Sequence, residues 1–179
     1  MQGAQRGDAE AFGTLFQRYQ KAIFNFMRRL GMTAASAEEG TQDIFLKLWE
    51  RREQYHAGRN FRVYLYQIAR NHWLNQLRRK PVNPARYLDG RGGAEADPAV
   101  AAEKSDLEAK VREAIAGLPE TIRVPLILKL MQQLTYSEVS GITGLSPRQA
   151  EERVSEAFQV LGARLREREA RAAAPRRKS

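Results

Sequence analysis

Apolar residues recur at intervals of three and four along most of this sequence, and this spacing constrains the fold more than any other feature. Such intervals place side chains on one face of a helix. No alternation of apolar and polar residues is long enough to indicate a strand. The first apolar stripe comprises Phe12, Leu15, Phe16, Tyr19, Ile23, Phe26, Met27 and Leu30. We therefore predict an all-α fold.

Two further helices are expected in the N-terminal segment. Asp8 is positioned to cap the first helix. The second helix is predicted to begin at Ser36, because Ser36 and Glu39 have the spacing of a capping box. Its apolar residues are Ile44, Phe45, Leu48 and Trp49. The third helix is predicted over residues 61–80, and its apolar stripe comprises Phe61, Leu65, Ile68 and His72. Together these helices predict a compact N-terminal module at residues 1–80.

A second helical module is expected after a flexible linker at residues 81–104, a segment rich in proline and glycine with little apolar content. The module, residues 105–169, opens with the stripe Leu107, Val111, Ala114, Ile115 and Leu118. Pro119 suits the first turn of the next helix. Pro125 would cost about 3 kcal/mol inside a helix. A late helix start or a bend is therefore expected there.

A helix-turn-helix pattern ends this C-terminal module. Thr135 with Glu138 is a capping box, Gly144 makes a tight turn, and Ser146 with Gln149 is another capping box. The next helix is expected to direct inward Ala150, Val154, Ala157, Phe158, Leu161 and Leu165. In this motif the second helix enters the major groove of DNA. Any corner between two helices can have the same spacing, so the spacing leaves DNA binding and a purely structural corner both open.

Charge and composition narrow the partners. The net charge is +9, and residues 1–80 hold 14 Lys and Arg against 7 Asp and Glu. A further basic tail occupies residues 170–179. A basic surface favours a polyanion, either nucleic acid or an acidic membrane surface.

Several function classes are excluded by what the sequence lacks. It has no cysteine and two histidines, so neither a metal nor another cofactor is expected. Because it has no glycine-rich phosphate loop and no catalytic constellation, it is not expected to be an enzyme. No apolar run could span a bilayer and no signal peptide is evident, which predicts a cytoplasmic protein without membrane insertion.

Five segments, taken in order, resemble a known family. Residues 7–12, 42–49 and 61–71 resemble region 2 of the extracytoplasmic-function (ECF) sigma factors, the group-four members of the bacterial sigma-70 family. Residues 118–120 and the segments 134–139 with 144–146 resemble their region 4. The resemblance implies a subunit that joins core RNA polymerase, recognises −10 and −35 promoter elements and opens DNA. It also implies an anti-sigma factor as a partner.

The same resemblance assigns roles to individual residues. Docking on core polymerase is expected of Asp43, Leu46, Lys47, Trp49 and Glu50. Recognition and melting of the −10 element are expected of Arg59, Asn60, Arg62, Tyr64, Gln67, Arg70 and Asn71, with phosphate contacts from Arg78, Arg79 and Lys80. Recognition of the −35 element is expected of Arg148, Gln149, Glu152, Arg153 and Glu156. The two glutamates can read sequence, because a carboxylate accepts a hydrogen bond from cytosine N4.

The alternative is a stand-alone helix-turn-helix transcriptional regulator that acts without polymerase. Such a protein needs a dimerisation helix or a ligand pocket, and the N-terminal module has the signature of neither. The linker is long enough for two separate readers, because the 23 residues 81–103 reach at most ~75 Å at ~3.3 Å each. Two turns of DNA span ~70 Å.

Overall fold

The computed structural model describes residues 1–56, 58–79, 111 and 113–173, with the backbone alone at residues 79 and 168–173. Every secondary-structure element in these ranges is helical, which confirms the predicted all-α fold. The predicted linker at residues 81–104 lies outside the described residues. Lys80 and residues 174–179 of the basic tail also lie outside them.

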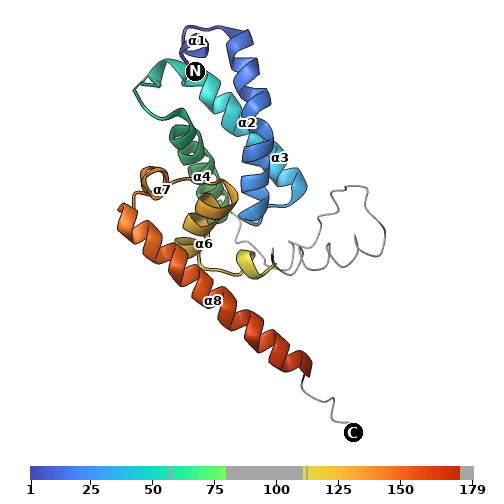
Figure 1. Ribbon diagram of the computed structural model, residues 1–179. Helices are drawn as coiled ribbons and strands as arrows, with labels where there is room; N and C mark the ends of the chain where they lie inside the picture. The colour runs from blue at the N-terminus through green and yellow to red at the C-terminus, as the bar shows by residue number, and fades with distance from the viewer. Residues whose placement is uncertain (57, 80–110, 112, 174–179) are drawn as a thin grey trace, which may run out of the picture.

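Three long helices form the N-terminal module (Figure 1). After the short α1 (Gln2–Gln5), these are α2 (Ala9–Arg29), α3 (Ala34–Glu50) and α4 (Phe61–Arg79), with the 3₁₀ turn η1 (Arg52–Gln54) between the last two. The apolar stripe of α2 faces inward as expected, and Ile23, Phe26 and Met27 are completely buried. Ile44 and Leu48 of α3 are completely buried as well. The 3.6-residue period therefore identifies this core correctly.

The N-terminal ends of α2 and α3 show one correct and one wrong prediction. Asp8 caps α2, because its Oδ1 accepts hydrogen bonds from the backbone N–H groups of Glu10 and Ala11, both at 3.0 Å. The predicted cap at Ser36 is wrong. Thr33 caps α3 instead, and its Oγ1 accepts from the Ser36 N–H at 3.2 Å. The residues after Thr33 include two alanines, the best helix former, which explains why the helix begins three residues earlier than expected.

The C-terminal module contains α6 (Glu120–Leu126), the π-helical turn η3 (Ile127–Met131), α7 (Tyr136–Thr143) and α8 (Pro147–Ala173). The late helix start expected from Pro125 is wrong, because α6 begins directly after Pro119. Pro125 has no N–H to donate to the preceding turn. The helix changes to wider π-helical pairing just after it, and the Gln132 N–H donates to the Ile127 carbonyl at 3.2 Å.

The turn between α7 and α8 follows the predicted chemistry. Thr135 and Glu138 form the full capping box at the start of α7. Gly144 takes φ +80° at its end, a left-handed conformation that glycine adopts without strain. Ser146 and Gln149 exchange hydrogen bonds at the start of α8, at 2.9 and 3.2 Å. The helix-turn-helix geometry is therefore set by local sequence.

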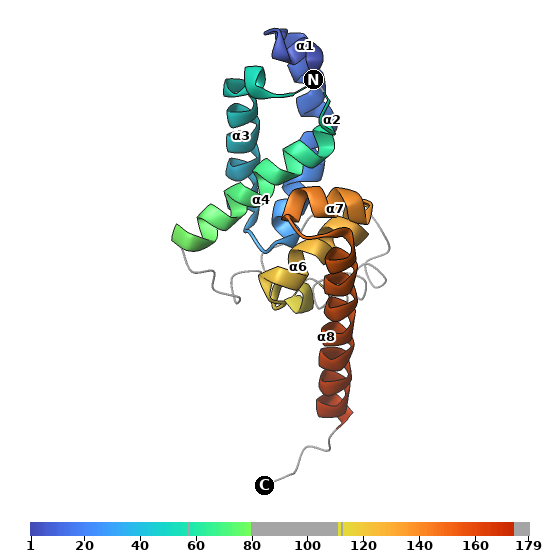
Figure 2. The ribbon, with the colours of Figure 1, turned by 90° about the vertical axis from the view of Figure 1, so that its left-hand side faces the viewer.

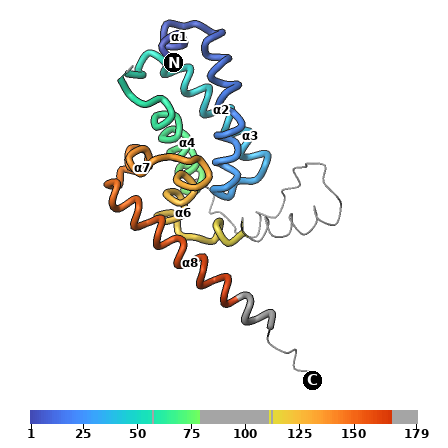
Figure 3. Tube along the Cα trace, viewed as in Figure 1, coloured from blue at the N-terminus to red at the C-terminus, as the bar shows by residue number. Residues whose placement is uncertain are grey.

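Burial along α8 differs from the prediction. Ala150, Val154 and Ala157 are buried, but Phe158 and Leu165 are 51% and 45% exposed. Their predicted inward orientation is wrong. Leu165 lies in the C-terminal half of α8, which extends beyond both modules (Figures 1 and 3). Phe158 lies in the first half, where Val154, Ala157 and Leu161 form the packed side. Val111, expected in the apolar stripe before α6, is likewise 41% exposed.

The two modules pack against each other. Tyr66 and Trp73 of α4 belong to the same buried cluster as Leu126, Ile127 and Leu128 of the C-terminal module. Figure 2, turned by 90° from Figure 1, shows α6 and α7 beside α4, as Figure 1 does. The π-helical turn η3 also contacts α2. One side of α4 therefore faces the three-helix core, and the other faces the C-terminal module.

Candidate nucleic-acid interface

The predicted −10 residues lie along the start of α4 and the loop before it. We call the set Arg59, Asn60, Arg62, Tyr64, Gln67, Arg70 and Asn71 the reading face. Asn60 caps the helix, because its Oδ1 accepts from the backbone N–H groups of Arg62 and Val63 at 3.0 and 3.3 Å. This cap fixes the direction in which the loop enters α4, and with it the position of Arg59.

An aromatic and cationic cluster occupies the entry to α4. The Arg59 guanidinium lies 5.8 Å from the centre of the Tyr64 ring, and the Tyr55 ring lies 5.4 Å from that ring. The Tyr55 hydroxyl donates to the Arg59 carbonyl at 2.5 Å. Burial raises the pKa of Tyr55 despite the opposing charge of Arg59. The cluster thus presents a half-buried ring next to a cation, the combination on which unstacked bases pack.

Tyr55 was not among the predicted site residues. It is 5% exposed and its ring packs against the half-buried Tyr64 ring, so it helps to hold that ring in place. Its position in the sequence could have identified it. Tyr55 lies four residues before Arg59, and an aromatic residue in such a loop usually packs against another side chain. Arg78 lies exposed near the end of α4, and the side chain of Arg79 is among those not described.

Several reading-face residues contact the C-terminal module. The Arg62 guanidinium donates to the Gln132 carbonyl, and the Gln67 amide donates to the Gly141 carbonyl. Arg70 forms an ion pair with Glu120 at 3.8 Å. Asn71 is exposed. No sequence pattern predicts these contacts between the two modules.

The Asn60 side chain also reaches the C-terminal module. Its Nδ2 donates to Glu138 Oε1 at 3.3 Å, and Glu138 is the carboxylate of the α7 capping box. The Thr135 backbone N–H holds the pKa of Glu138 below its usual value, with smaller contributions from the Thr135 hydroxyl, Arg62 and Asn60. The charged carboxylate therefore serves the cap and the cross-module contact together.

The predicted polymerase-docking residues share the outer side of α3. Leu46 is 57% exposed, and Lys47 and Glu50 beside it are exposed too. Asp43 is half-buried. Trp49 is half-buried as well, between the Phe12 ring and the Arg52 guanidinium, which lie 4.9 and 4.5 Å from its ring centre. An exposed leucine surrounded by charged residues fits a docking surface, because nothing in the described part of the chain covers it and a partner can.

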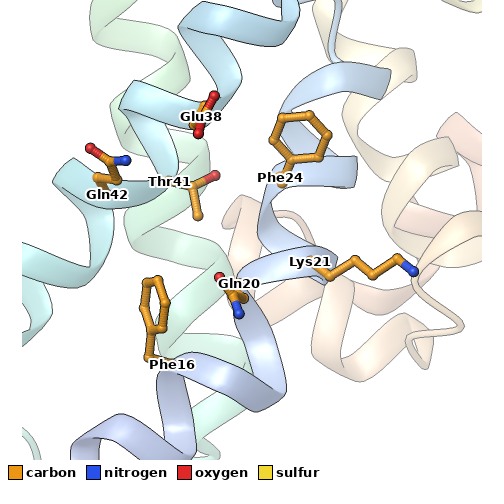
Figure 4. A pocket seen from close by; sticks show the side chains of 7 residues that line it. All are labelled: Phe16, Gln20, Lys21, Phe24, Glu38, Thr41 and Gln42. Atoms are coloured by element: carbon orange, nitrogen blue, oxygen red, sulfur yellow. The ribbon is translucent and has the colours of Figure 1, made fainter. Parts of the chain in front are cut away.

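A hollow of about 370 Å³ lies between α2 and α3, and the sequence did not predict it. Figure 4 shows side chains from both helices around it. Its lining comprises Phe16, Gln20, Lys21 and Phe24 of α2 with Glu38, Thr41 and Gln42 of α3. Gln42 is next to the predicted docking residue Asp43, so the hollow adjoins that surface.

The predicted −35 residues lie on the outward side of α8, where all five are exposed. Arg148 pairs with Glu152 at 3.0 Å, and Arg153 pairs with Glu156 at 2.8 Å. Exposed pairs of this kind contribute about 0–1 kcal/mol, so DNA can replace them at little cost. The Gln149 side chain accepts from the Ser146 N–H, which fixes it at the first turn.

Two observations concern other classes of site. Within the described ranges, no three His, Asp or Glu residues are grouped as metal ligands would be. No described helix is long and apolar enough to cross a membrane.

Fold and site together describe a helical protein with a basic aromatic face and a helix-turn-helix. Residues 15–81 match the family Sigma-70 region 2. The chain is 30% identical over 139 residues to ECF RNA polymerase sigma factor RpoE of Cereibacter sphaeroides, with 77% of each chain covered. It is 25% identical over 176 residues to ECF RNA polymerase sigma factor SigW of Bacillus subtilis, covering 91% and 93%. The chain therefore belongs to the ECF RNA polymerase sigma factors of the sigma-70 family.

Solved structures agree with the fold. CnrH, in complex with the cytosolic domain of CnrY, superimposes with a TM-score of 0.71 at 23% identity, covering 90% of this chain and 92% of that one. RpoE of Bartonella quintana, in complex with the anti-sigma factor NepR, gives 0.67 at 21%, covering 88% and 98%. Family membership supports the sigma-factor interpretation over the stand-alone regulator. Members of the family are DNA-binding transcription initiation factors.

Proposed function

We propose that this sigma factor directs core RNA polymerase to promoters by a division of labour between its modules. The N-terminal module, residues 1–80, docks on core and reads and opens the −10 element. The C-terminal module, residues 105–169, reads the −35 element, and residues 81–104 connect the two. The protein acts in the cytoplasm without a catalytic group or a cofactor of its own.

The observation that carries this proposal is the cluster of Tyr64, Arg59 and Tyr55 at the start of α4. Strand opening requires a surface that stabilises an unstacked base and cations that hold the backbone. The half-buried Tyr64 ring supplies a stacking face, and Arg59 and Arg62 supply the charge. Stacking on an aromatic side chain is worth about 1–3 kcal/mol per base. That energy favours the separated strand over the duplex.

Recognition upstream is assigned to the outward side of α8. A recognition helix contacts bases mainly through its N-terminal residues, and Arg148, Gln149 and Glu152 stand in the first two turns. Arg148 can donate to guanine and Glu152 can accept from cytosine N4. Glu152 and Glu156 add negative charge next to the DNA phosphates. This module therefore determines where on the DNA the protein binds more than how tightly it binds.

Docking on core polymerase is assigned to Leu46 with Asp43, Lys47, Trp49 and Glu50. Leu46 supplies apolar area at the centre of the surface, and the charges around it supply orientation. An anti-sigma factor is proposed as a further partner. One structural neighbour, RpoE of Bartonella quintana, is in complex with the anti-sigma factor NepR, and at 21% identity this neighbour bears only on the fold.

Transcription in vitro with purified core polymerase on a promoter library tests the proposal. With the protein present, transcripts should begin at a subset of templates, and permanganate should modify thymines upstream of each start. Core polymerase alone is the first control. A variant with Tyr64→Ala and Arg59→Ala should retain core binding but lose permanganate reactivity. Absence of initiation on every template would contradict the sigma-factor mechanism.

A further inference from the structure

We propose that α1 holds the entry to the reading face in place, and that Gln5 is the residue through which it does so. This inference rests on the proposed function, since Arg59, Asn60 and Tyr64 are residues assigned to the −10 strand. Gln5 is a positioning residue, because it acts on them through Tyr55 and does not contact DNA itself.

The short helix α1 is fixed against the start of α2. It lies against both α2 and η1 (Figures 1 and 2). Ala4 is completely buried. A Cβ atom added to Gly3 would lie 2.9 Å from Cβ of Ala11, so α1 packs closely against α2. The Asp8 N–H donates to the Gly3 carbonyl at 3.2 Å, and the Asp8 side chain caps α2. The helix α1 therefore belongs to the fixed part of the N-terminal module.

The Gln5 amide joins α1 to the segment that leads into α4. Its Nε2 donates to the Tyr55 carbonyl at 2.7 Å and to the Glu53 carbonyl at 3.5 Å. A glutamine amide has two N–H donors, so one side chain can serve both carbonyls. Both carbonyls lie at the end of η1, where no further helical turn supplies a donor. The contact therefore fixes the chain at the point where it leaves η1.

Tyr55 connects this contact to the reading face. Its hydroxyl donates to the Arg59 carbonyl at 2.5 Å, and its ring centre lies 5.4 Å from that of Tyr64. The ring also packs edge-on against Phe61, with the ring centres 6.0 Å apart. Because Tyr55 is buried, a shift of its backbone moves its ring and hydroxyl together. The positions of Arg59 and Tyr64 therefore depend on the contact with Gln5.

Arg59 and Asn60 lie on an exposed stretch of chain, and His56 is exposed as well. The Arg59 N–H donates to the His56 carbonyl at 2.9 Å, a hydrogen bond within this stretch. Burial does not hold an exposed loop, and ordering its backbone costs conformational entropy. Polar contacts at its ends therefore decide how much of the time it has one conformation. Loss of the Gln5 contact should loosen this loop and leave the helical core intact.

Amide hydrogen exchange measures the position of the loop in the free protein. The variant Gln5→Met keeps the length of the side chain and removes both donors. The Arg59 amide should then exchange at least ~5-fold faster, because a part-buried carbonyl left without its donor shifts the local equilibrium by about that factor. The Val139 amide of α7 should exchange as before. Gln2→Met is the matched control, since Gln2 is exposed on the same helix.

A promoter library measures the consequence for recognition. Core polymerase with each variant transcribes templates that are randomised at the −10 and −35 elements. Gln5→Met should reduce the enrichment of preferred bases at the −10 element at least ~5-fold, the factor expected for the loosened loop. Enrichment at the −35 element and capture by core should not change. A merely structural role would lower the yield from all templates alike, so a loss confined to the −10 element identifies a positioning role.

Two results would overturn the inference. Unchanged exchange of the Arg59 amide in Gln5→Met would show that α1 does not hold the loop. An unchanged −10 preference, or an equal loss at both elements, would show that the contact does not serve recognition. If the unmodified protein itself selects no template, the proposed function fails, and the exchange measurement still decides whether Gln5 positions Arg59.

Discussion

Gly141→Ala is the substitution that most directly perturbs the contact between α4 and α7 without replacing a residue of the reading face. The new Cβ would lie 2.9 Å from Cγ1 of Val63, whereas carbon atoms pack at about 3.5–4.0 Å. Val63 is β-branched and has one strongly preferred rotamer on a helix. The two helices must therefore separate by about 0.6 Å or more if the two modules are to stay packed against each other. We call this packed arrangement closed, and the one in which the modules are apart open.

The magnitude follows from two opposing effects. Overpacking at a tight contact costs about 1–3 kcal/mol. Replacing glycine by alanine inside a helix stabilises that helix by about 0.5–1 kcal/mol. This second effect cancels between the open and closed arrangements, because α7 is helical in both. A penalty of about 1–3 kcal/mol on the closed arrangement alone lowers its ratio to the open one by roughly 5–150-fold.

Binding to single-stranded DNA measures this ratio, because Arg62 and Gln67 donate to the C-terminal module in the closed arrangement. When only a fraction of a protein is competent to bind, its apparent affinity is reduced by that fraction. A largely closed protein should therefore bind a fluorescent random-sequence oligonucleotide roughly 5–150-fold more tightly after Gly141→Ala, measured by anisotropy at one fixed salt concentration. Gly13→Ala is the matched control, since a Cβ there meets nothing within 4 Å and α2 should gain the same helical preference.

Equal dissociation constants for the unmodified protein and both variants would refute this reasoning, because closure would then not limit access to α4. Tighter binding by both variants would attribute the effect to helix stability instead. Binding by none of the three would count against the reading face, and so against the proposed function.

Two other predictions concern single side chains. Asp43→Arg reverses a charge beside exposed Leu46 and should abolish capture by core polymerase while leaving the helical circular dichroism intact; unchanged capture would remove Asp43 from the docking surface. Burial raises the pKa of Tyr66 to about 12 from 10.0, with Arg62 opposing this rise. The raised pKa means that the packed modules favour the protonated phenol, whose hydroxyl donates to Gln132. The contribution of Tyr66 to the packing of the modules is therefore complete below pH 10 and is lost as the pH rises through about 12. Tyrosinate absorbance of the unmodified protein minus that of Tyr66→Phe should show this late step, and a difference titrating near pH 10 would contradict it.

The sequence was sufficient where structure depends on neighbouring residues. Helix caps at Asp8, Thr135 and Ser146 involve partners two to three residues away, so their chemistry is visible in a short window. The exception at the start of α3 has the same origin. Thr33 and Ser36 can both cap a helix, and a spacing rule cannot decide which one wins when the residues between them also favour helix.

It was harder to predict which apolar side chains are buried, because burial depends on which other segments of the chain pack against a helix. Phe158 lies on a side of α8 that the described chain does not cover, and Leu165 continues the apolar spacing towards the C-terminal end of the helix. Periodicity shows that a helix has an apolar side but does not show that anything covers it. The same limit explains Trp73, for which the sequence indicated no role. Its cationic partner Arg123 lies fifty residues later in another module.

The sequence was enough to predict which residue types form the candidate site. It was not enough to predict that several of them contact the C-terminal module. Arg62, Gln67 and Arg70 were identified as donors suited to DNA, and that chemistry suits protein acceptors equally well. The predicted linker is long enough for the modules to lie up to ~75 Å apart. A linker of this length also allows the two modules to contact each other. The choice between these arrangements depends on long-range packing, which no local pattern encodes.

The two proposed surfaces of the N-terminal module differ in access, and this difference implies an order of events. Leu46, Lys47 and Glu50 on α3 are exposed while the modules are closed, whereas Arg62 and Gln67 on α4 are engaged. Core polymerase can therefore dock before the modules separate, but the −10 strand cannot bind. A partner that binds closed and open forms equally well cannot shift the balance between them. Core must therefore also contact the C-terminal module or the connecting segment in a way that favours separation.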